Sequence, residues 1–369
     1  MTDIRHLVPE WVRTLTPYPP GKPIEEVERE LGIRGSIKLA SNENPLGPSP
    51  MAVAAIADAL GSVHLYPDGS AIYLRRRLAE RHGVSPDDVL VGNGSNEIIE
   101  LVARTFLRPR DEAVMADQAF VIYRMVVQAM AATPRVVPLK QFTHDLEAMA
   151  EAVTPRTRLV FLANPNNPTG TIFRRAAWEA FLRALPPGQL IVVADDAYAD
   201  YVEDPDYPNT IAARGDGAVP VVTLRTFSKL YGLAGLRIGY AVAPGPVIEA
   251  MQRIRQPFNV NALALVGALA ALDDREHVRR TLEVNRQGMR MLGHGFERLG
   301  LSFVPSAANF LLVRVGRGLE VYDALLRRGV IVRPMDTYGL PEYLRVTVGL
   351  PDENRRFLEA LDAVLHGGA

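Results

Sequence analysis

Residues 223–240, TLRTFSKLYGLAGLRIGY, place a lysine where an apolar run ends. Lys229 follows Ser228 and precedes a glycine-rich turn, and Arg237 lies eight positions further on. A free lysine has a pKa of about 10.4, so its amine works as a nucleophile or base at neutral pH only if it is desolvated or lies near other positive charge. The stretch therefore predicts a reactive amine at the end of a strand.

Three other apolar runs also end in polar residues that suit ligand binding. In VLVGNGSNEIIEL, residues 89–101, a strand leads through a glycine turn into a helix whose free N–H groups and positive dipole end favour an anion. The turn NPNNPTG, residues 164–170, presents asparagine side chains, and Asp195 ends the run LIVVAD. The glycine turn is neither a Walker A loop, because no GK[ST] follows, nor a Rossmann motif, because Glu97 occupies the third glycine position.

Together, these four strand ends predict one cofactor site. The carboxyl ends of parallel strands meet at the edge of a sheet where ligands bind. Pyridoxal phosphate needs a helix N-terminus and a cation for its phosphate, an acid for its pyridine nitrogen and an amine for its aldehyde. The glycine turn, an asparagine, Asp195 and Lys229 supply these parts in an order that suits an α/β sheet. We therefore expect pyridoxal 5'-phosphate as the cofactor.

The elements that must position these residues alternate along the chain between helices and short apolar strands. Apolar residues recur at intervals of three and four in the predicted helices 23–31, 71–83, 96–106 and 174–185. The predicted strands are 88–92, 158–163, 190–195, 221–227 and 237–243. Several of them are apolar throughout, which is typical of a mostly parallel sheet covered by helices on both faces.

The length of 369 residues favours two domains. We expect a large α/β domain at residues 41–255, and a smaller α+β domain built from residues 1–40 together with 256–369. The second part begins with a long helical region from 261 to about 300, continues through strands 309–315 and 343–349, and closes with a helix that starts at Pro351.

Composition excludes several classes of function. The 41 Lys and Arg residues balance 42 Asp and Glu residues, which argues against a nucleic-acid partner. The apolar runs are far shorter than the roughly 20 residues of a membrane-spanning helix, and the N-terminus has no apolar signal-peptide core, so we expect no membrane association and a cytoplasmic location. With no cysteine and no paired spacing among seven histidines, we expect no metal site.

The motifs NENPLGPSP, YPDG, NPNNPTG, DDAYADY, TFSKLYGLAGLRIGY and LRVTVG, taken in order, resemble those of a known family. The chain is similar, from about residue 14 to its C-terminus, to the fold-type I aminotransferases of the aspartate aminotransferase superfamily, and within them to the histidinol-phosphate aminotransferase branch. The resemblance implies transamination between L-histidinol phosphate and 2-oxoglutarate, giving imidazole acetol phosphate and L-glutamate, in a step of histidine biosynthesis.

The resemblance also implies which residues bind the cofactor. Lys229 would bond to its aldehyde and then act as general base and acid, Asp195 would pair with the pyridine nitrogen, and Tyr198 would contact the ring hydroxyl oxygen together with Asn167. The phosphate would be bound by Gly94, Ser95, Asn96, Thr226, Ser228 and Arg237. Phe120 would stack on the ring, with Tyr123 as the rival for that role. Tyr66 would reach the phosphate in the partner subunit, which implies a homodimer.

For the substrate, the resemblance implies that Arg345 grips a carboxylate and that Arg333 and Tyr18 help to bind the phosphate of histidinol phosphate. Asn44 and Asn167 complete the implied substrate contacts. Two related activities stay open at this point: an aromatic amino acid aminotransferase, and a threonine-phosphate decarboxylase, which would need no 2-oxoglutarate. A cofactor-bearing regulator ranks last, because the chain has neither spare length nor a basic segment for a DNA-binding domain.

Overall fold

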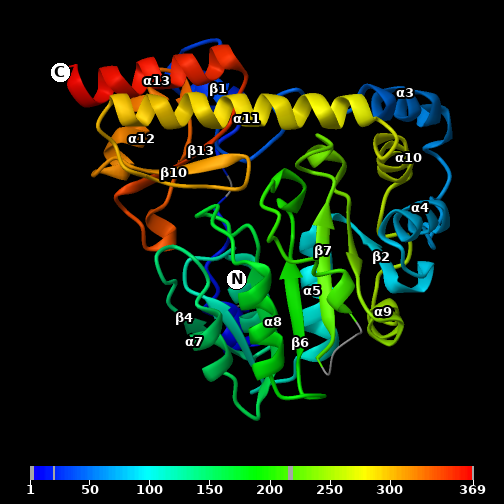
Figure 1. Ribbon diagram of the computed structural model, residues 1–369. Coiled ribbons are helices and arrows are strands. Elements are labelled where there is room, and N and C mark those ends of the chain that lie inside the picture. Colours follow the sequence, from blue (N-terminus) through cyan, green and yellow to red (C-terminus); the bar gives the residue numbers. More distant parts are fainter. Residues whose placement is uncertain (1–3, 20, 215–218, 368–369) are drawn as a thin grey trace.

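A computed structural model describes residues 4–19, 21–214 and 219–367. Within these residues, seven strands form a central sheet in the order β2-β8-β7-β6-β5-β3-β4 (Figure 1). The strands are β2 (Val89–Gly92), β3 (Glu112–Ala116), β4 (Thr133–Val137), β5 (Thr157–Ala163), β6 (Ile191–Asp195), β7 (Val221–Thr226) and β8 (Gly239–Val242). Neighbours pair in parallel except at β8, which is antiparallel to both β2 and β7. The predicted mostly parallel sheet is confirmed.

Helices cover both faces of this sheet, which explains why most residues of its central strands are apolar and buried. One face packs against α5 (Gly94–Phe106), α6 (Ile122–Ala129) and α9 (Gly245–Gln252), and the other against α7 (Leu146–Glu151) and α8 (Arg175–Ala184). In Figure 1, α8 lies in front of the sheet and α5 behind it. Successive residues alternate between the two cores: Phe161 of β5 belongs to the first, whereas Val160 and Leu162 belong to the second.

At the β2 and β8 edge, the second face is covered by three other helices. These are α3 (Pro50–Ala59), α4 (Ile72–His82) and α10 (Ala262–Ala271), and α10 packs closely along α3. The helical region expected over 261–300 is therefore two helices, α10 and α11 (Arg275–Arg298). The break has a local cause, because Asp274 caps α11 by accepting a hydrogen bond from the backbone N–H of His277 at 3.0 Å.

The C-terminal part forms its own antiparallel sheet in the order β12-β13-β10-β9. Its strands are β9 (Phe303–Val304), β10 (Phe310–Arg314), β12 (Arg333–Pro334) and β13 (Tyr343–Thr347), and they pack against α11, α12 (Gly318–Leu326) and α13 (Pro351–His366). The N-terminal segment carries α1 (Glu10–Arg13), α2 (Ile24–Leu31) and β1 (Ile37–Lys38). β1 pairs in parallel with β11 (Val330–Ile331), so residues near 40 lie beside the C-terminal part.

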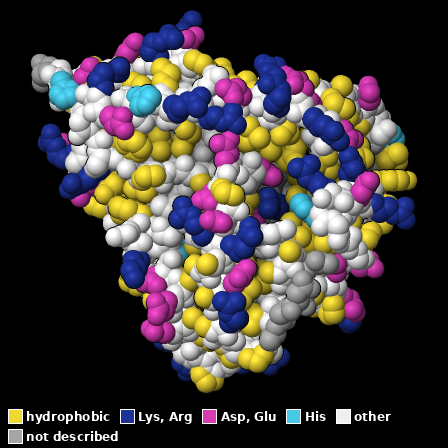
Figure 2. Space-filling view, viewed as in Figure 1, with side chains coloured by type: hydrophobic (Ala, Val, Ile, Leu, Met, Phe, Trp, Pro, Cys, Tyr) yellow, Lys and Arg dark blue, Asp and Glu magenta, His cyan; other side chains and the backbone are white. Residues whose placement is uncertain are grey.

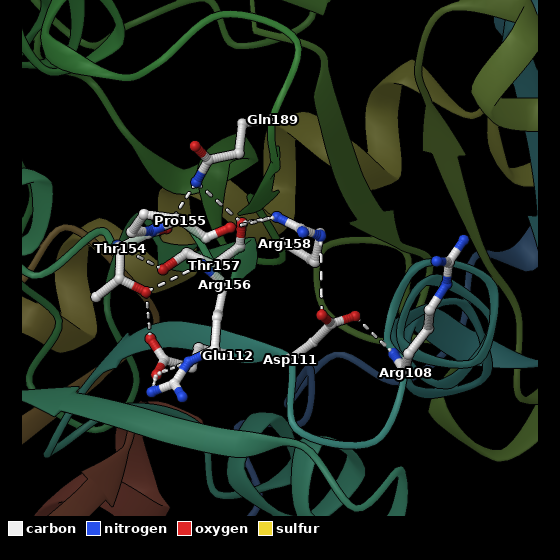
Figure 3. A network of polar contacts seen from close by, with 9 residues as sticks. All are labelled: Arg108, Asp111, Glu112, Thr154, Pro155, Arg156, Thr157, Arg158 and Gln189. Atoms are coloured by element: carbon white, nitrogen blue, oxygen red, sulfur yellow. Dashed lines mark hydrogen bonds and ion pairs between the residues drawn. The ribbon is translucent and has the colours of Figure 1, made fainter.

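Two strands of the large sheet, β3 and β4, were not expected from the sequence. β4 is the edge strand, so it tolerates Pro134 and Arg135, which weaken its apolar pattern. β3 begins with Glu112, and this buried but charged residue interrupts the apolar pattern by which a strand is recognised in the sequence. Figure 3 shows that this carboxylate receives hydrogen bonds from Thr154 and Arg156, which precede β5.

The molecular surface mixes both signs of charge. Figure 2 shows Lys and Arg side chains interspersed with Asp and Glu side chains over the visible face, as the near-zero net charge implies. No helix within the described residues is long and apolar enough to cross a membrane.

Candidate active site

A cavity of about 260 Å³ opens at the carboxyl ends of the central strands. It is lined by these residues singled out from the sequence: Tyr18, Ser95, Asn96, Phe120, Asn167, Asp195, Tyr198, Thr226, Ser228, Lys229, Arg237, Arg333 and Arg345. Residues from 18 to 345 thus meet in one place, because the sheet edge faces both the N-terminal segment and β13. Such a cavity, lined by a few charged groups, is the place to look for chemistry.

Lys229 follows the end of β7, and its Nζ donates a hydrogen bond to the backbone oxygen of Ser41 at 3.1 Å. Burial, followed by the positive charge of Arg345, lowers the pKa of Lys229 to about 8. The turn that follows it needs a glycine, since Gly232 has a φ of +68° and a Cβ there would lie 2.1 Å from the backbone oxygen of Gly47. The amine is therefore held in place and is partly neutral near physiological pH.

Asp195 ends β6 and is nearly fully buried. The hydroxyl of Tyr123 donates to its Oδ2 at 2.5 Å, and the backbone N–H of Ala197 donates to its Oδ1 at 3.2 Å. Burial raises the pKa of Asp195, and these two hydrogen bonds offset that effect only in part. A buried carboxylate in this state suits a cationic or protonated nitrogen as its partner.

Tyr123 and Phe120 take different places beside Asp195. The Tyr123 ring stacks on Phe161 with 5.0 Å between centroids, and its hydroxyl is committed to the carboxylate. Phe120 meets Tyr123 edge to face and remains half-buried at the cavity wall. Phe120 is thus the aromatic ring with a face available to a flat ligand.

The first turn of α5 and Arg237 form one corner of the cavity. Gly94 begins the helix with a φ of +76°, and a Cβ there would lie 2.7 Å from Arg237 Nη2. The N-cap residue Asn93 makes no side-chain cap, so its side chain does not compete for the first N–H groups of α5. Free helix N–H groups beside a guanidinium are suited to a phosphate. Ser228 and Thr226 line the same cavity.

Arg345 is buried and forms no ion pair among the described residues. Its Nη1 donates to Asn167 Oδ1 at 2.6 Å and its Nη2 to the backbone oxygen of Ala40 at 2.7 Å, whereas its Nε has no partner. Arg333 lies directly opposite on the antiparallel β12. Like charges placed opposite each other on neighbouring strands repel, so this pair indicates that the cavity binds an anion.

Arg333 also contacts the N-terminal segment. Its Nη2 donates to the backbone oxygen of Pro19 at 2.9 Å, and its guanidinium lies 5.6 Å from the centroid of the Tyr18 ring. The two predicted phosphate-binding residues are therefore neighbours, although they are 315 positions apart in the chain. Arg345 likewise packs over the Phe310 ring at 5.3 Å.

Three predicted residues are absent from the cavity lining: Gly94, Asn44 and Tyr66. Asn44 was expected to contact substrate, but its Nδ2 donates to the backbone oxygen of Leu230 and to Thr281, and its Oδ1 accepts from the N–H of Leu46. Its side chain is therefore occupied with holding the loop, and the predicted contact with substrate stays a prediction. Tyr66 is 83% exposed and stacks on Phe258 with 4.7 Å between ring centroids.

Four cavity-lining residues with polar side chains were missed in the sequence: Ser41, Asn42, Glu43 and Tyr338. Ser41 stands just before the NENP motif, Asn42 and Glu43 are the first two residues of that motif, and Tyr338 lies in a short 3-10 helix after β12. Asn42 donates from Nδ2 to the hydroxyl of Tyr198 at 2.9 Å. Its place in the SNENPLG stretch drew attention to the neighbouring Asn44, but nothing in the sequence indicated a contact with a residue 156 positions away.

Comparison with known proteins agrees with this geometry. The model of the family "Aminotransferase class I and II" matches residues 34–361. The chain belongs to this aminotransferase family. The predicted fold class and the predicted enzyme class are thereby confirmed.

This aminotransferase has curated relatives of similar length. It is 51% identical to the histidinol-phosphate aminotransferase of Moorella thermoacetica, over 96% of the chain and 92% of the relative. It is 50% identical to that of Symbiobacterium thermophilum, over 97% and 98%. Among solved structures, the histidinol-phosphate aminotransferase from Sinorhizobium meliloti, described as a complex with pyridoxal-5'-phosphate, has a TM-score of 0.89 at 27% identity and covers 98% of each chain.

Proposed function

We propose that this aminotransferase transfers the amino group between L-histidinol phosphate and 2-oxoglutarate, giving imidazole acetol phosphate and L-glutamate, with pyridoxal 5'-phosphate as cofactor. The observation that carries the proposal is the set of charges in one cavity: Lys229 with its lowered pKa, the buried acid Asp195, and the facing pair Arg333 and Arg345. The names of the relatives that are about 50% identical over almost the whole chain support this choice of substrate.

The residues present fit the cofactor. When bound, pyridoxal phosphate supplies an aldehyde for the amino nitrogen and a ring that takes up electrons. Its phosphate would lie at the start of α5, held by the backbone of Gly94, Ser95 and Asn96 with Arg237, Ser228 and Thr226. Its ring would stack on Phe120, with the pyridine nitrogen on Asp195. Asn167 Oδ1 already accepts from Arg345, which leaves its Nδ2 to donate to the ring oxygen beside Tyr198.

Each of these side chains would have its own part in the reaction. Lys229 would hold the cofactor through its amine and, once that amine is free, would act as the general base and acid that moves the proton of the substrate α-carbon. Asp195 holds the proton on the pyridine nitrogen. Tyr198 and Asn167 stabilise the ring oxygen with hydrogen bonds. Arg345 forms no ion pair among the described residues, and its Nε has no partner, so its guanidinium can present a fork to a carboxylate of glutamate. For histidinol phosphate, Arg333 and Tyr18 extend this positive wall toward the phosphate.

We further propose a homodimer in which Tyr66 enters the partner's site. Tyr66 is one of several exposed apolar side chains in and beside the segment between α3 and α4: Met51 and Val53 of α3, Leu60, Val63 and Leu65 after it, and Tyr73 of α4. An exposed apolar segment of this kind is typical of protein–protein interfaces. The stacked pair of Tyr66 and Phe258 would be covered in such a dimer.

The experiment is the visible absorbance of the protein loaded with pyridoxal phosphate, before and after it is mixed with L-glutamate, L-histidinol phosphate or L-phenylalanine. We expect a visible band that bleaches with glutamate and with histidinol phosphate. Lys229→Ala is the matched control and should lack the Lys229-dependent band. Stronger bleaching by phenylalanine than by histidinol phosphate would replace the proposed substrate with an aromatic amino acid.

A further inference from the structure

Asn42 is a buried residue of the cavity, and each of its hydrogen bonds has a fixed donor and a fixed acceptor. Its backbone N–H donates to Thr347 Oγ1 at 2.9 Å, and Thr347 Oγ1 donates to Asn42 Oδ1 at 3.0 Å. Because the threonine hydroxyl has a single hydrogen, that hydrogen goes to Oδ1. Both residues are nearly inaccessible, with exposed fractions of 1% and 3%. Water therefore cannot readily replace either residue as the hydrogen-bond partner of the other.

This pair decides which end of the Asn42 amide faces Tyr198. With Oδ1 held by Thr347, Nδ2 points to the Tyr198 hydroxyl and donates to it at 2.9 Å. The reverse orientation would leave the buried hydrogen of Thr347 without an acceptor, which is disfavoured. The backbone of Asn42 is held in place as well. Its φ is +55°, and its carbonyl oxygen accepts a hydrogen bond from Asn309 Nδ2 at 3.1 Å.

A hydroxyl that accepts a hydrogen bond must send its own hydrogen elsewhere. Within the part of the chain that the structure describes, no residue accepts the hydrogen of Tyr198, and Tyr198 lines the cavity. We propose that Asn42, fixed by Thr347, is a positioning residue that directs the Tyr198 hydrogen into the cavity, toward the ring oxygen of the cofactor. The inference rests on the proposed function, which places that oxygen beside Tyr198.

The same contact ties the substrate-binding strand to the cofactor side of the site. Thr347 and Arg345 lie two positions apart on β13 and share the face toward the cavity, whereas Leu344, Val346 and Val348 lie in the core behind it. The charged and titratable groups around Tyr198 come from several elements: Arg345, Asp195, Lys229, Tyr123, Tyr201 and Tyr338. A substitution at Thr347 leaves all of them in place.

The test is a pH titration of the visible band of the pyridoxal phosphate-loaded enzyme. The Tyr198 hydrogen competes for the negative ring oxygen with the proton of the Lys229–cofactor bond. When the Tyr198 hydrogen is lost, the ring oxygen holds that proton more tightly. The pH at the midpoint of the titration should therefore rise. For Thr347→Val, which frees the amide to turn, we expect a rise of about one pH unit, or ~1.4 kcal/mol. Thr347→Ser keeps the hydroxyl and should titrate like the wild type.

A double-variant cycle separates this role from a merely structural one. Tyr198→Phe alone should raise the midpoint, and adding Thr347→Val to it should cause no further rise, because the first change already removes the hydrogen. Additive shifts, or an unshifted Thr347→Val, would overturn the proposal. If Thr347→Val does not fold, Asn42→Asp is the second variant, since its carboxylate accepts the Tyr198 hydrogen and its shift should vanish in the Tyr198→Phe background. A wild type without a visible band would instead contradict the proposed function.

Discussion

Arg333 and Arg345 lie directly opposite each other on β12 and β13, and both side chains line the cavity that contains Lys229. Two guanidinium groups so placed repel each other unless an anion lies between or beside them. The pair therefore lowers the stability of the fold when no anion is bound, and an anionic ligand in the cavity would offset this repulsion.

The first prediction concerns Arg345. Arg345→Lys keeps the positive charge but loses the planar fork that binds a carboxylate through two parallel hydrogen bonds. We expect kcat/KM for L-glutamate to fall about 100-fold, equivalent to ~2.7 kcal/mol. Steady-state kinetics measure this. Arg327→Lys, at the exposed C-cap of α12 and outside the cavity lining, is the matched control and should leave kcat/KM unchanged. Equal values for Arg345→Lys and the wild type would remove Arg345 from the substrate site.

The second prediction concerns pH. Only the neutral amine of Lys229 attacks an aldehyde, and the pKa of Lys229 is lowered to about 8. The rate at which the apoprotein forms the visible band with pyridoxal phosphate should therefore be nearly constant above pH 8. Below pH 8 it should fall by about tenfold per pH unit. Stopped-flow absorbance measures the rate. A fall that begins near pH 10 would show that the amine is not desolvated.

The third prediction concerns Tyr66. Tyr66→Phe keeps the ring that stacks on Phe258 but removes the hydroxyl proposed to reach the partner's phosphate site. We expect pyridoxal phosphate to bind about tenfold more weakly, in line with the loss of one charge-assisted hydrogen bond, while the sedimentation coefficient stays that of a dimer. Tyr73→Phe, which alters the exposed tyrosine of α4, is the control. Unchanged cofactor affinity in Tyr66→Phe would remove the hydroxyl from the site.

The fourth prediction concerns stability. Burial alone would raise the pKa of Glu112, but hydrogen bonds from Thr154 and Arg156 outweigh it, so that pKa is lowered from 4.5. A lowered carboxyl pKa stabilises the fold above the unfolded value, and this contribution is lost as pH falls through the folded pKa. Glu112→Gln should therefore reduce the free energy of unfolding at pH 7 by about 2 kcal/mol, and the difference should shrink below pH 4.5.

Chemical denaturation at several pH values measures this difference. The control is Glu100→Gln, because Glu100 forms an exposed pair with Arg104 on the surface of α5 at 3.6 Å. Pairs of that kind contribute little, so a change below about 0.5 kcal/mol is expected. A pH-independent loss in Glu112→Gln would mean that packing, and not charge, is responsible.

The sequence was sufficient for those features that follow from local pattern. The strand that ends at Asp195 is apolar up to that residue, and the strand before Lys229 is rich in Val and Leu, so their ends could be recognised. The parallel-sheet rule then brought both residues to one edge. Arg345 was identified by its place in LRVTVG, where Leu344 and Val346 face the core. These inferences need only the residues next to the one in question.

The remaining features depend on contacts between distant segments. Asn42 reaches Tyr198, and Tyr123 reaches Asp195, 156 and 72 positions away. Neither partner is marked by spacing or composition. Asn44 looked like a ligand because it is polar in a conspicuous motif, whereas its amide is occupied by Leu230 and by Thr281 of α11. Which of two nearby asparagines faces a cavity is decided by tertiary packing alone.

The Glu112 network of Figure 3 lies at the amino ends of β3 and β5, and the cavity lies beyond the carboxyl ends of the strands. The polar groups that secure the sheet are thus separated, by the length of a strand, from those that line the cavity. A substitution at the cavity rim therefore leaves the hydrogen bonds of Glu112 with Thr154 and Arg156 in place.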